Sequence, residues 1–306
     1  MIAALAGGVG AARFLSGLVQ VVEPRSVVAV VNIADDVVLH GLHVSPDIDT
    51  VVYGLAGAGN PETGWGLAGE SWAVMEALGR FPSRFAWFNL GDRDLATHLY
   101  RTQRLDEGAR LSEVTSELAA AWGVAVRVLP VTDDPVETRV TVEAGEIGFQ
   151  DYFVRMRHAV PVRAVRFAGV ESARPAPGVL DALATAERVV ICPSNPVVSI
   201  GPVLAVPGIS EALSNRREDV VAVSPIVAGA ALKGPADRLL RELGHEASVV
   251  GVARLYAPVA ATLVVDEADA ALAGTVEAEG VRCRVAPTVM HGPAEAAALA
   301  RAVLGG

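Results

Sequence analysis

Residues 26–50 read SVVAVVNIADDVVLHGLHVSPDIDT, and this stretch decides the fold class of the chain. Its first six residues are rich in valine, which is typical of a short strand buried on both faces of a parallel sheet. Asn32 and the acidic residues after it therefore lie at or beyond the carboxyl end of a strand. In open parallel sheets this is the edge at which ligands bind.

Two tight acidic clusters follow that strand, and they comprise Asp35, Asp36, Asp47 and Asp49. No Lys or Arg occurs between residues 26 and 79, so we expect no basic partner nearby. Carboxylates a few ångströms apart repel, so either one is protonated or a bound cation neutralises both. Oxygen ligands in this number suit Mg²⁺. The alternative is that these residues form turns and helix caps, since Asp after Ser-Pro commonly begins a helix.

Short valine-rich strands alternate with helices along the rest of the chain, which predicts an α/β fold: a Rossmann-like, mostly parallel sheet with helices on both faces. We expect a single α/β domain over residues 1–306. A strand, a glycine turn and a second strand at residues 139–149 predict a β-hairpin insertion within residues 130–168, with a further strand at 163–167. The expected strands of the main sheet are Ile2 to Leu5, Val27 to Val31, Phe85 to Phe88, Val124 to Leu129, Arg188 to Cys192, Val220 to Val223, Ser248 to Val252, Thr262 to Val265 and Val281 to Val285.

Composition excludes two classes of partner. The formal net charge is -10 and the pI is near 5.1, which argues against a nucleic-acid surface. Mean hydropathy is +0.40, but no apolar run approaches the ~20 residues of a membrane span. Cys192 and Cys283 lie in apolar segments without metal-ligand spacing, which predicts reduced, buried thiols. Without a basic leader at Met1, we expect a cytoplasmic protein.

A glycine-rich turn, AGGVGAAR at residues 6–13, follows the first expected strand. Backbone N–H groups of Gly8 and Gly10 can face a phosphate or another anion at the start of the next helix. The turn is a weak dinucleotide fingerprint, because Arg13 replaces the third glycine and the second strand ends in Asn32 rather than in an acid. A tight turn without a ligand is the alternative.

Two later turns repeat the pattern of a strand followed by small polar residues. In ICPSNPVVSIGP, residues 191–202, prolines fix the loop while Ser194, Asn195 and Ser199 offer donors for a phosphate or a guanine edge. Lys233, the only lysine, follows a later strand. It is either a solvated surface charge or a phosphate contact.

A series of motifs gives the chain a family resemblance. In order they are GGVGAARF, VVNIADD, HGLHVSPDIDTVVYGLAG, NPETGWG, WFNLGDRDLATHLYRTQ, FQDYFVRMR, ICPSNPVVSIGP, AVSPIVAGAALKGPADRLL and VVDEADA. Together they closely resemble the 2-phospho-L-lactate transferase family, which makes the deazaflavin coenzyme F-420. Ala11-Ala12 stands where many members of that family have a further glycine.

The resemblance implies transfer from a guanosine diphosphate ester of a three-carbon acid to the deazaflavin alcohol Fo. The terminal ribityl hydroxyl would attack the phosphorus that bears the acid, and GMP would leave. Asp35 and Asp47 would hold Mg²⁺. Asp49 and Arg93 would hold Fo, with Asp49 or Asp47 accepting the hydroxyl proton. The residues expected to line the guanosine diphosphate side, from their place on the sheet, are Gly8, Gly10, Ser194, Asn195 and Ser199.

Two other classes of protein stay open. A regulatory relative that binds a sugar nucleotide on a similar body shares the glycine loop, but PDID at residues 46–49 and GDRD at residues 91–94 favour the transferase. A nicotinamide oxidoreductase would use the same loop, and the missing third glycine counts against it.

Three further features are left open by the sequence. It does not distinguish a lactyl, enolpyruvyl or glyceryl unit, since these differ by a few atoms. We expect a homo-oligomer, whose subunit number the sequence does not fix. Trp65, Trp87 and Phe88 are expected either to pack in the core or to line an apolar slot for the deazaflavin ring.

Overall fold

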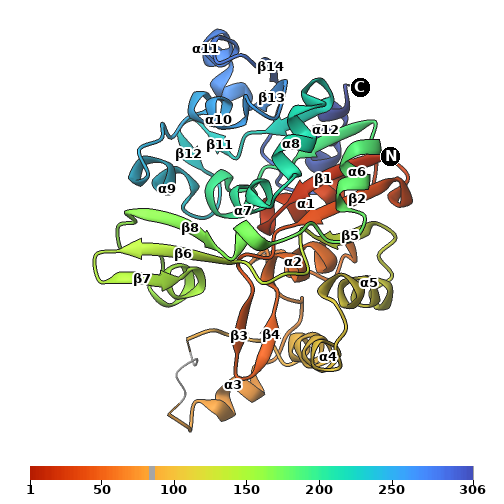
Figure 1. Ribbon diagram of the computed structural model, residues 1–306, viewed down its shortest axis with the longest axis vertical. Coiled ribbons are helices and arrows are strands. Elements are labelled where there is room, and N and C mark those ends of the chain that lie inside the picture. Colours follow the sequence, from red (N-terminus) through yellow and green to blue (C-terminus); the bar gives the residue numbers. More distant parts are fainter. Residues whose placement is uncertain (83–86, 306) are drawn as a thin grey trace.

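The computed structural model describes residues 1–82 and 87–305. Its centre is a seven-stranded sheet in the order β14-β13-β10-β9-β1-β2-β5. All paired strands of this sheet run parallel, so the predicted α/β fold is confirmed (Figure 1). The strands are β1 (Ile2–Ala6), β2 (Val27–Val31), β5 (Arg127–Pro130), β9 (Arg188–Ile191), β10 (Val220–Val223), β13 (Thr262–Val265) and β14 (Arg282–Val285).

The strand order reverses at β1. From β1 the chain moves outward to β2 and β5, and then returns to β9 on the other side of β1 before continuing to β10, β13 and β14. Ala6 pairs with Val31 and Leu5 with Ile191, so the three strands end at the same level. A crevice at such a switch point is where doubly wound sheets bind ligands.

Helices cover the sheet on both faces (Figure 1). The first helix, α1, packs against α2 and α12, whereas α8 packs against α6 and α7. The α-helices are α1 (Gly8–Leu18), α2 (Pro46–Leu55), α3 (Ala73–Leu78), α4 (Asp94–Asp106), α5 (Leu111–Ala121), α6 (Val179–Thr185), α7 (Gly201–Ala205), α8 (Ile209–Ser214), α9 (Ala236–Glu242), α10 (Val249–Tyr256), α11 (Ala273–Ala278) and α12 (Pro293–Leu304). In the part of the chain that the structure describes, no helix has the length and apolar character needed to cross a bilayer.

One predicted strand is wrong. Residues 248–252 belong to helix α10, and the hydroxyl of Ser248 accepts hydrogen bonds from the backbone N–H groups of Val250 and Gly251. A serine cap starts a helix, and a short apolar run after it does not by itself distinguish a buried helix from a buried strand. The strand expected at Phe85 to Phe88 falls partly on residues 83–86, which lie outside the described residues, and Phe88 lies in a bend.

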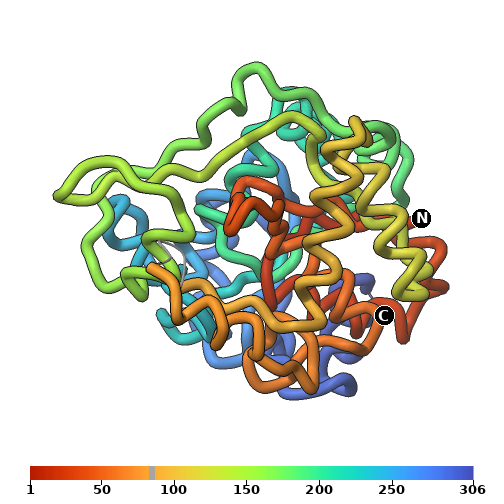
Figure 2. Tube along the Cα trace, turned by 90° about the horizontal axis from the view of Figure 1, so that it is seen from below, coloured from red at the N-terminus to blue at the C-terminus, as the bar shows by residue number. Residues whose placement is uncertain are grey.

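A three-stranded antiparallel sheet is inserted between β5 and β9, as the sequence predicts. Its order is β7-β6-β8, formed by β6 (Glu137–Val142), β7 (Gly145–Gly148) and β8 (Ala164–Ala168). Two small hairpins complete the strands: β3 (Val37–Leu39) with β4 (Leu42–Val44), beside α4, and β11 (Ile226–Val227) with β12 (Ala230–Ala231). The inserted sheet lies on the opposite side of the molecule from both termini (Figures 1 and 2).

Helix α1 lies very close to α12, and a glycine makes this approach possible. A Cβ atom added at Gly17 would lie 2.2 Å from the backbone carbonyl carbon of Ala296. The Gly17→Ala variant should therefore lower the free energy of unfolding by about 1–3 kcal/mol, measured by urea denaturation. The matched control is Gly274→Ala in α11, where an added Cβ meets nothing within 4 Å. Equal losses in both variants would contradict the close packing of α1 on α12.

Candidate functional site

A cavity of about 760 Å³ opens at the carboxyl edge of the sheet. The predicted site residues that line it are Gly8, Gly10, Asp35, Asp47, Asp49, Ser194, Asn195 and Ser199. Arg93 does not line it among the described residues; its side chain is exposed, and Nη1 donates a hydrogen bond to the backbone oxygen of Ala68 at 2.8 Å. The predicted role of Arg93 stays a prediction.

Asp47 is fixed where three elements meet. It lies in the first turn of α2, and its Oδ2 accepts a hydrogen bond from Asn32 Nδ2, at the end of β2, at 2.9 Å. The backbone N–H of Gly8, at the start of α1, donates to the same carboxylate. A Cβ at Gly7 would lie 2.8 Å from Asp47 Oδ2, so this position needs glycine. The carboxylate is thus held at the carboxyl ends of β1 and β2.

Asp35 and Asp47 are buried acids that interact with each other. Burial and the charge of Asp47 raise the pKa of Asp35 well above its ordinary value, and burial raises the pKa of Asp47 to about 6. Asp35 Oδ1 is buried and has no hydrogen-bond partner in the described chain. Within residues 1–82 and 87–305, neither carboxylate has an ion pair to Lys or Arg. Oxygen donors of this kind fit a hard divalent cation, which would relieve the repulsion.

Asp49 differs from this pair, and the expectation of no basic partner is wrong for it. The Arg101 side chain, fully buried in α4, donates from Nη1 to Asp49 Oδ2 at 3.1 Å and from Nη2 to Asp49 Oδ1. The sequence around Asp49 does not indicate this partner, because Arg101 lies 52 residues away in the chain. His98 and Arg101, spaced i and i+3, lie on one helix face, but this spacing does not identify Asp49 as a partner.

Asp49, Asp94 and His98 form a second group that could hold a metal, since one ligand atom from each lies within 4.8 Å of the others. Protein groups already engage most of this set, although His98 Nε2 has no hydrogen-bond partner among the described residues. Tyr53 OH donates to Asp94 Oδ1 at 2.6 Å, and Arg101 Nη1 lies 3.2 Å from His98 Nδ1. Burial opposes ionisation of Asp94, but hydrogen bonds and charge from His98 lower its pKa. With the Arg101 cation in place, the Asp35 and Asp47 pair is the better site for a metal.

Of the three aromatic residues expected in the core or at the cavity wall, Trp65 and Phe88 line the cavity. Trp65 is 48% exposed and lines the cavity together with Phe88, so neither belongs to the main core. Trp87 packs edge-on against Phe88, with ring centroids 5.8 Å apart.

Asp92 accepts hydrogen bonds from the first backbone N–H groups of α3, at residues 73 and 74, and therefore caps that helix.

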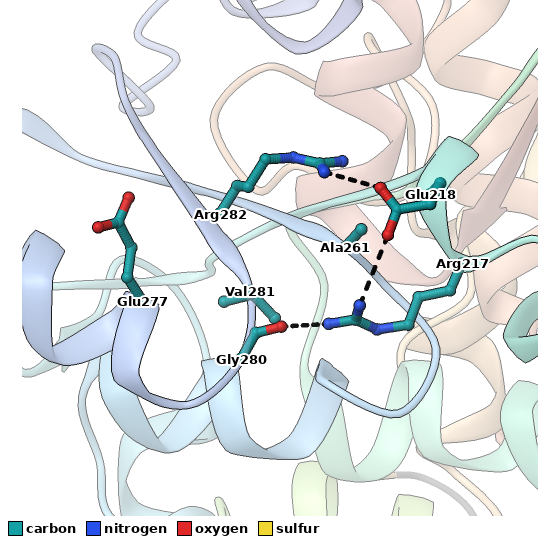
Figure 3. Close-up of a pocket in the computed structure, with 7 residues that line it drawn as sticks. All are labelled: Arg217, Glu218, Ala261, Glu277, Gly280, Val281 and Arg282. Carbon is teal, nitrogen blue, oxygen red and sulfur yellow. Dashed lines mark hydrogen bonds and ion pairs between the residues drawn. The ribbon is translucent and has the colours of Figure 1, made fainter.

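A smaller cavity of about 290 Å³ lies at the opposite edge of the sheet, before β10, β13 and β14 (Figure 3). Three of its charged side chains pair with each other: Arg282 Nη1 lies 2.7 Å from Glu218 Oε2, and Arg217 Nη1 lies 3.8 Å from Glu218 Oε1. Arg217 also donates to the backbone oxygens of Ala257 and Gly280. These contacts tie together the starts of three strands and leave the larger cavity as the candidate site.

Comparisons with known proteins identify the family. The family model described as 2-phospho-L-lactate transferase CofD matches residues 2–288. Phosphoenolpyruvate transferases of Streptomyces griseus and Kitasatospora aureofaciens are 47% and 46% identical, over 99% of this chain and 97% and 96% of theirs. That of Mycolicibacterium smegmatis is 39% identical over 99% of this chain and 97% of its own. The chain belongs to the CofD 2-phospho-L-lactate transferase family and is a transferase.

Solved structures share the fold. Two crystal structures of a upf0052-family protein from Bacillus halodurans match 99% of this chain and 98% of theirs, with TM-scores of 0.63 and 0.64. Their sequence identity is 18%, so the likeness concerns the fold alone.

The raised pKa of Asp47 predicts a cost in stability. Because the folded pKa lies above the unfolded value of about 3.9, protonated Asp47 stabilises the fold at low pH, and this contribution is lost as the pH rises through about 6. At pH 7 in EDTA, Asp47→Asn should therefore raise the free energy of unfolding by on the order of 1–3 kcal/mol. Urea denaturation at several pH values measures this, and the gain should shrink toward pH 4.

The control is Asp106→Asn, the same change at an exposed position. A gain in Asp47→Asn that does not depend on pH, or a loss of stability at pH 7, would contradict a buried, destabilising charge.

Proposed function

We propose that this enzyme transfers a phosphoenolpyruvate unit from enolpyruvyl-diphosphoguanosine to the terminal hydroxyl of Fo, in the biosynthesis of coenzyme F-420. The products would be dehydro-F-420-0 and GMP. The observation that carries the choice of donor is the 46–47% identity, over nearly the whole chain, to relatives named phosphoenolpyruvate transferase. The family match over residues 2–288 supports catalysis over the regulatory alternative.

Asp35 and Asp47 would hold Mg²⁺ in this reaction. Their burial, their raised pKa values and the lack of a basic partner in the described part of the chain support that assignment. When bound, the metal neutralises phosphate oxygens at which charge builds up during an in-line displacement. Asn32 and the backbone of Gly8 keep the Asp47 carboxylate in place for this role.

Asp49 would orient the attacking hydroxyl and receive its proton. Arg101 occupies both carboxylate oxygens from the protein side, which fixes the rotamer of Asp49 while one face still lines the cavity. Phosphoryl transfer proceeds through a loose transition state, so the nucleophile needs orientation more than a strong base. An ion-paired carboxylate meets that requirement.

The apolar part of the cavity suits the flat ring of Fo. Trp65, Phe88, Phe149 and Phe153 line it, and Phe149 stacks on Phe153 with centroids 5.4 Å apart. Aromatic and aliphatic walls with a few convergent polar groups are typical of sites for large cofactors.

A competition assay tests the proposal. The protein is incubated with Mg²⁺, Fo and equal amounts of enolpyruvyl-, lactyl- and glyceryl-diphosphoguanosine, and the products are identified by mass spectrometry. We expect mainly dehydro-F-420-0 with an equal amount of GMP. Asp35→Asn should lower the rate by about two orders of magnitude or more, since it removes several kcal/mol of charge stabilisation. The surface variant Asp106→Asn should keep the rate of the unaltered protein.

These outcomes distinguish an error in the proposed donor from an error in the proposed reaction. A dominant lactyl or glyceryl product would contradict the donor alone. Absence of GMP release with all three donors would contradict the transferase reaction.

A further inference from the structure

A strained loop, residues 156–163, adjoins the aromatic wall that Phe149 and Phe153 form in the cavity. Phe153 also stacks on His158 of this loop, with ring centroids 5.4 Å apart and 27° between the rings. Arg157 and His158 have positive φ values of 50° and 41°. Two consecutive residues other than glycine in the left-handed region cost free energy, and such backbone persists only where surrounding groups hold it. The loop therefore needs support from another element.

Helix α9 supplies this support through two charged side chains. Arg238 Nη1 donates a hydrogen bond to the backbone oxygen of His158 at 2.5 Å, and Nη2 donates to that of Ala159 at 3.4 Å. Glu242 Oε2 accepts a hydrogen bond from the backbone N–H of Val162 at 2.8 Å. The two side chains also pair with each other, since Arg238 Nε lies 2.6 Å from Glu242 Oε1. The loop is thus tied at two points to a single turn of α9.

These contacts amount to more than a surface ion pair. The Arg238 side chain is 32% exposed and that of Glu242 is 19% exposed, and each bonds the loop backbone as well as its partner. Exposed ion pairs contribute little, whereas hydrogen bonds with a charged donor or acceptor are stronger than neutral ones. Leu239, next to Arg238 in the chain, packs in one apolar cluster with Phe149 and Tyr152. Helix α9 therefore holds the aromatic wall by packing and by charged hydrogen bonds.

Two sequence motifs that no step of the proposed reaction uses meet at this contact. Residues 149–157 read FQDYFVRMR, and residues 234–240 read GPADRLL. The bonded groups lie 80 residues apart in the chain. Residues 233–236, at the start of α9 and just before it, line the same cavity as Phe153. One short segment therefore contributes to the cavity and supports its aromatic wall.

We infer that Arg238 and Glu242 are positioning residues for Fo, the flat acceptor of the proposed reaction. They hold the 156–163 loop, and through His158 they fix the ring of Phe153 on which the heteroaromatic ring of Fo would stack. This inference rests on the proposed function and deepens it, because it names what shapes the acceptor side of the cavity. Stacking depends on where the ring lies, so a displaced Phe153 weakens Fo binding and leaves the reacting groups unchanged.

Fo binding, measured by the fluorescence of the deazaflavin ring, tests this role without turnover. Arg238→Gln should weaken Fo binding by about tenfold, because the loop loses its charged hydrogen bonds. In steady-state kinetics the KM for Fo should rise by a similar factor, while kcat and the KM for the guanosine diphosphate ester stay within about twofold of the unaltered protein. Glu242→Gln keeps an acceptor for the N–H of Val162 and loses the ion pair, so its loss should be smaller. This second variant carries the test if Arg238→Gln does not fold.

A double-mutant cycle separates positioning from a general loss of structure. Phe153→Leu removes the ring, and in this background Arg238→Gln should have little further effect on Fo affinity, because both changes act through the same contact. The matched control is Arg241→Gln. It removes another ion pair of α9, in which Arg241 Nη2 lies 2.7 Å from Asp237 Oδ2 at i, i+4 spacing, and it should keep the Fo affinity.

Unchanged Fo affinity in folded Arg238→Gln and Glu242→Gln would overturn the inference. So would losses that simply add in the double variant, or an equal loss in Arg241→Gln. In each of these cases the unaltered protein binds Fo, so the proposed function stands. An unaltered protein that does not bind Fo would instead contradict the proposed acceptor, and this inference with it.

Discussion

The buried ion pair between Arg101 and Asp49 determines which of the clustered acids has a basic partner. Burying an arginine and a carboxylate is costly, and it is tolerated only where each satisfies the other. Here both guanidinium Nη atoms bond Asp49, so this carboxylate already has its cation. Asp35 and Asp47 have none among residues 1–82 and 87–305, and burial raises the pKa of each. Of the four acids, Asp49 is thus ion-paired and Asp36 accepts a hydrogen bond from Ser45, which leaves Asp35 and Asp47 as the pair available to a metal.

The charges of the cavity are arranged to match the reaction. Acidic groups come from the ends of β2 and α2, while Arg13 and Lys233 come from α1 and the segment before α9. The topological switch at β1 brings these segments, far apart in the sequence, to one edge of the sheet. Phosphoryl transfer depends mainly on positioning and electrostatics, so a cavity with separated charges and little other chemistry is well suited to it.

Much of this organisation could be predicted from the sequence, because valine runs mark buried strands and the polar residues after them must lie at one edge. The resemblance identified the family, since its motifs occur in order from end to end. Helix α10 was missed because SVVGV fits both a strand and a capped helix. Arg101 was missed for a different reason: its pairing with Asp49 depends on how α4 packs, which no local pattern encodes. The role of Arg93 stays a prediction, because a family motif names the residue and not the direction of its side chain, which is exposed here.

Anomalous diffraction from a crystal soaked with Mn²⁺ tests the division of the acidic cluster most directly, because it locates a divalent ion without reference to turnover. We predict one ion bound by the carboxylates of Asp35 and Asp47, with Asp49 still paired to Arg101. An ion bound instead by Asp49, Asp94 and His98, with Arg101 displaced, would contradict the account.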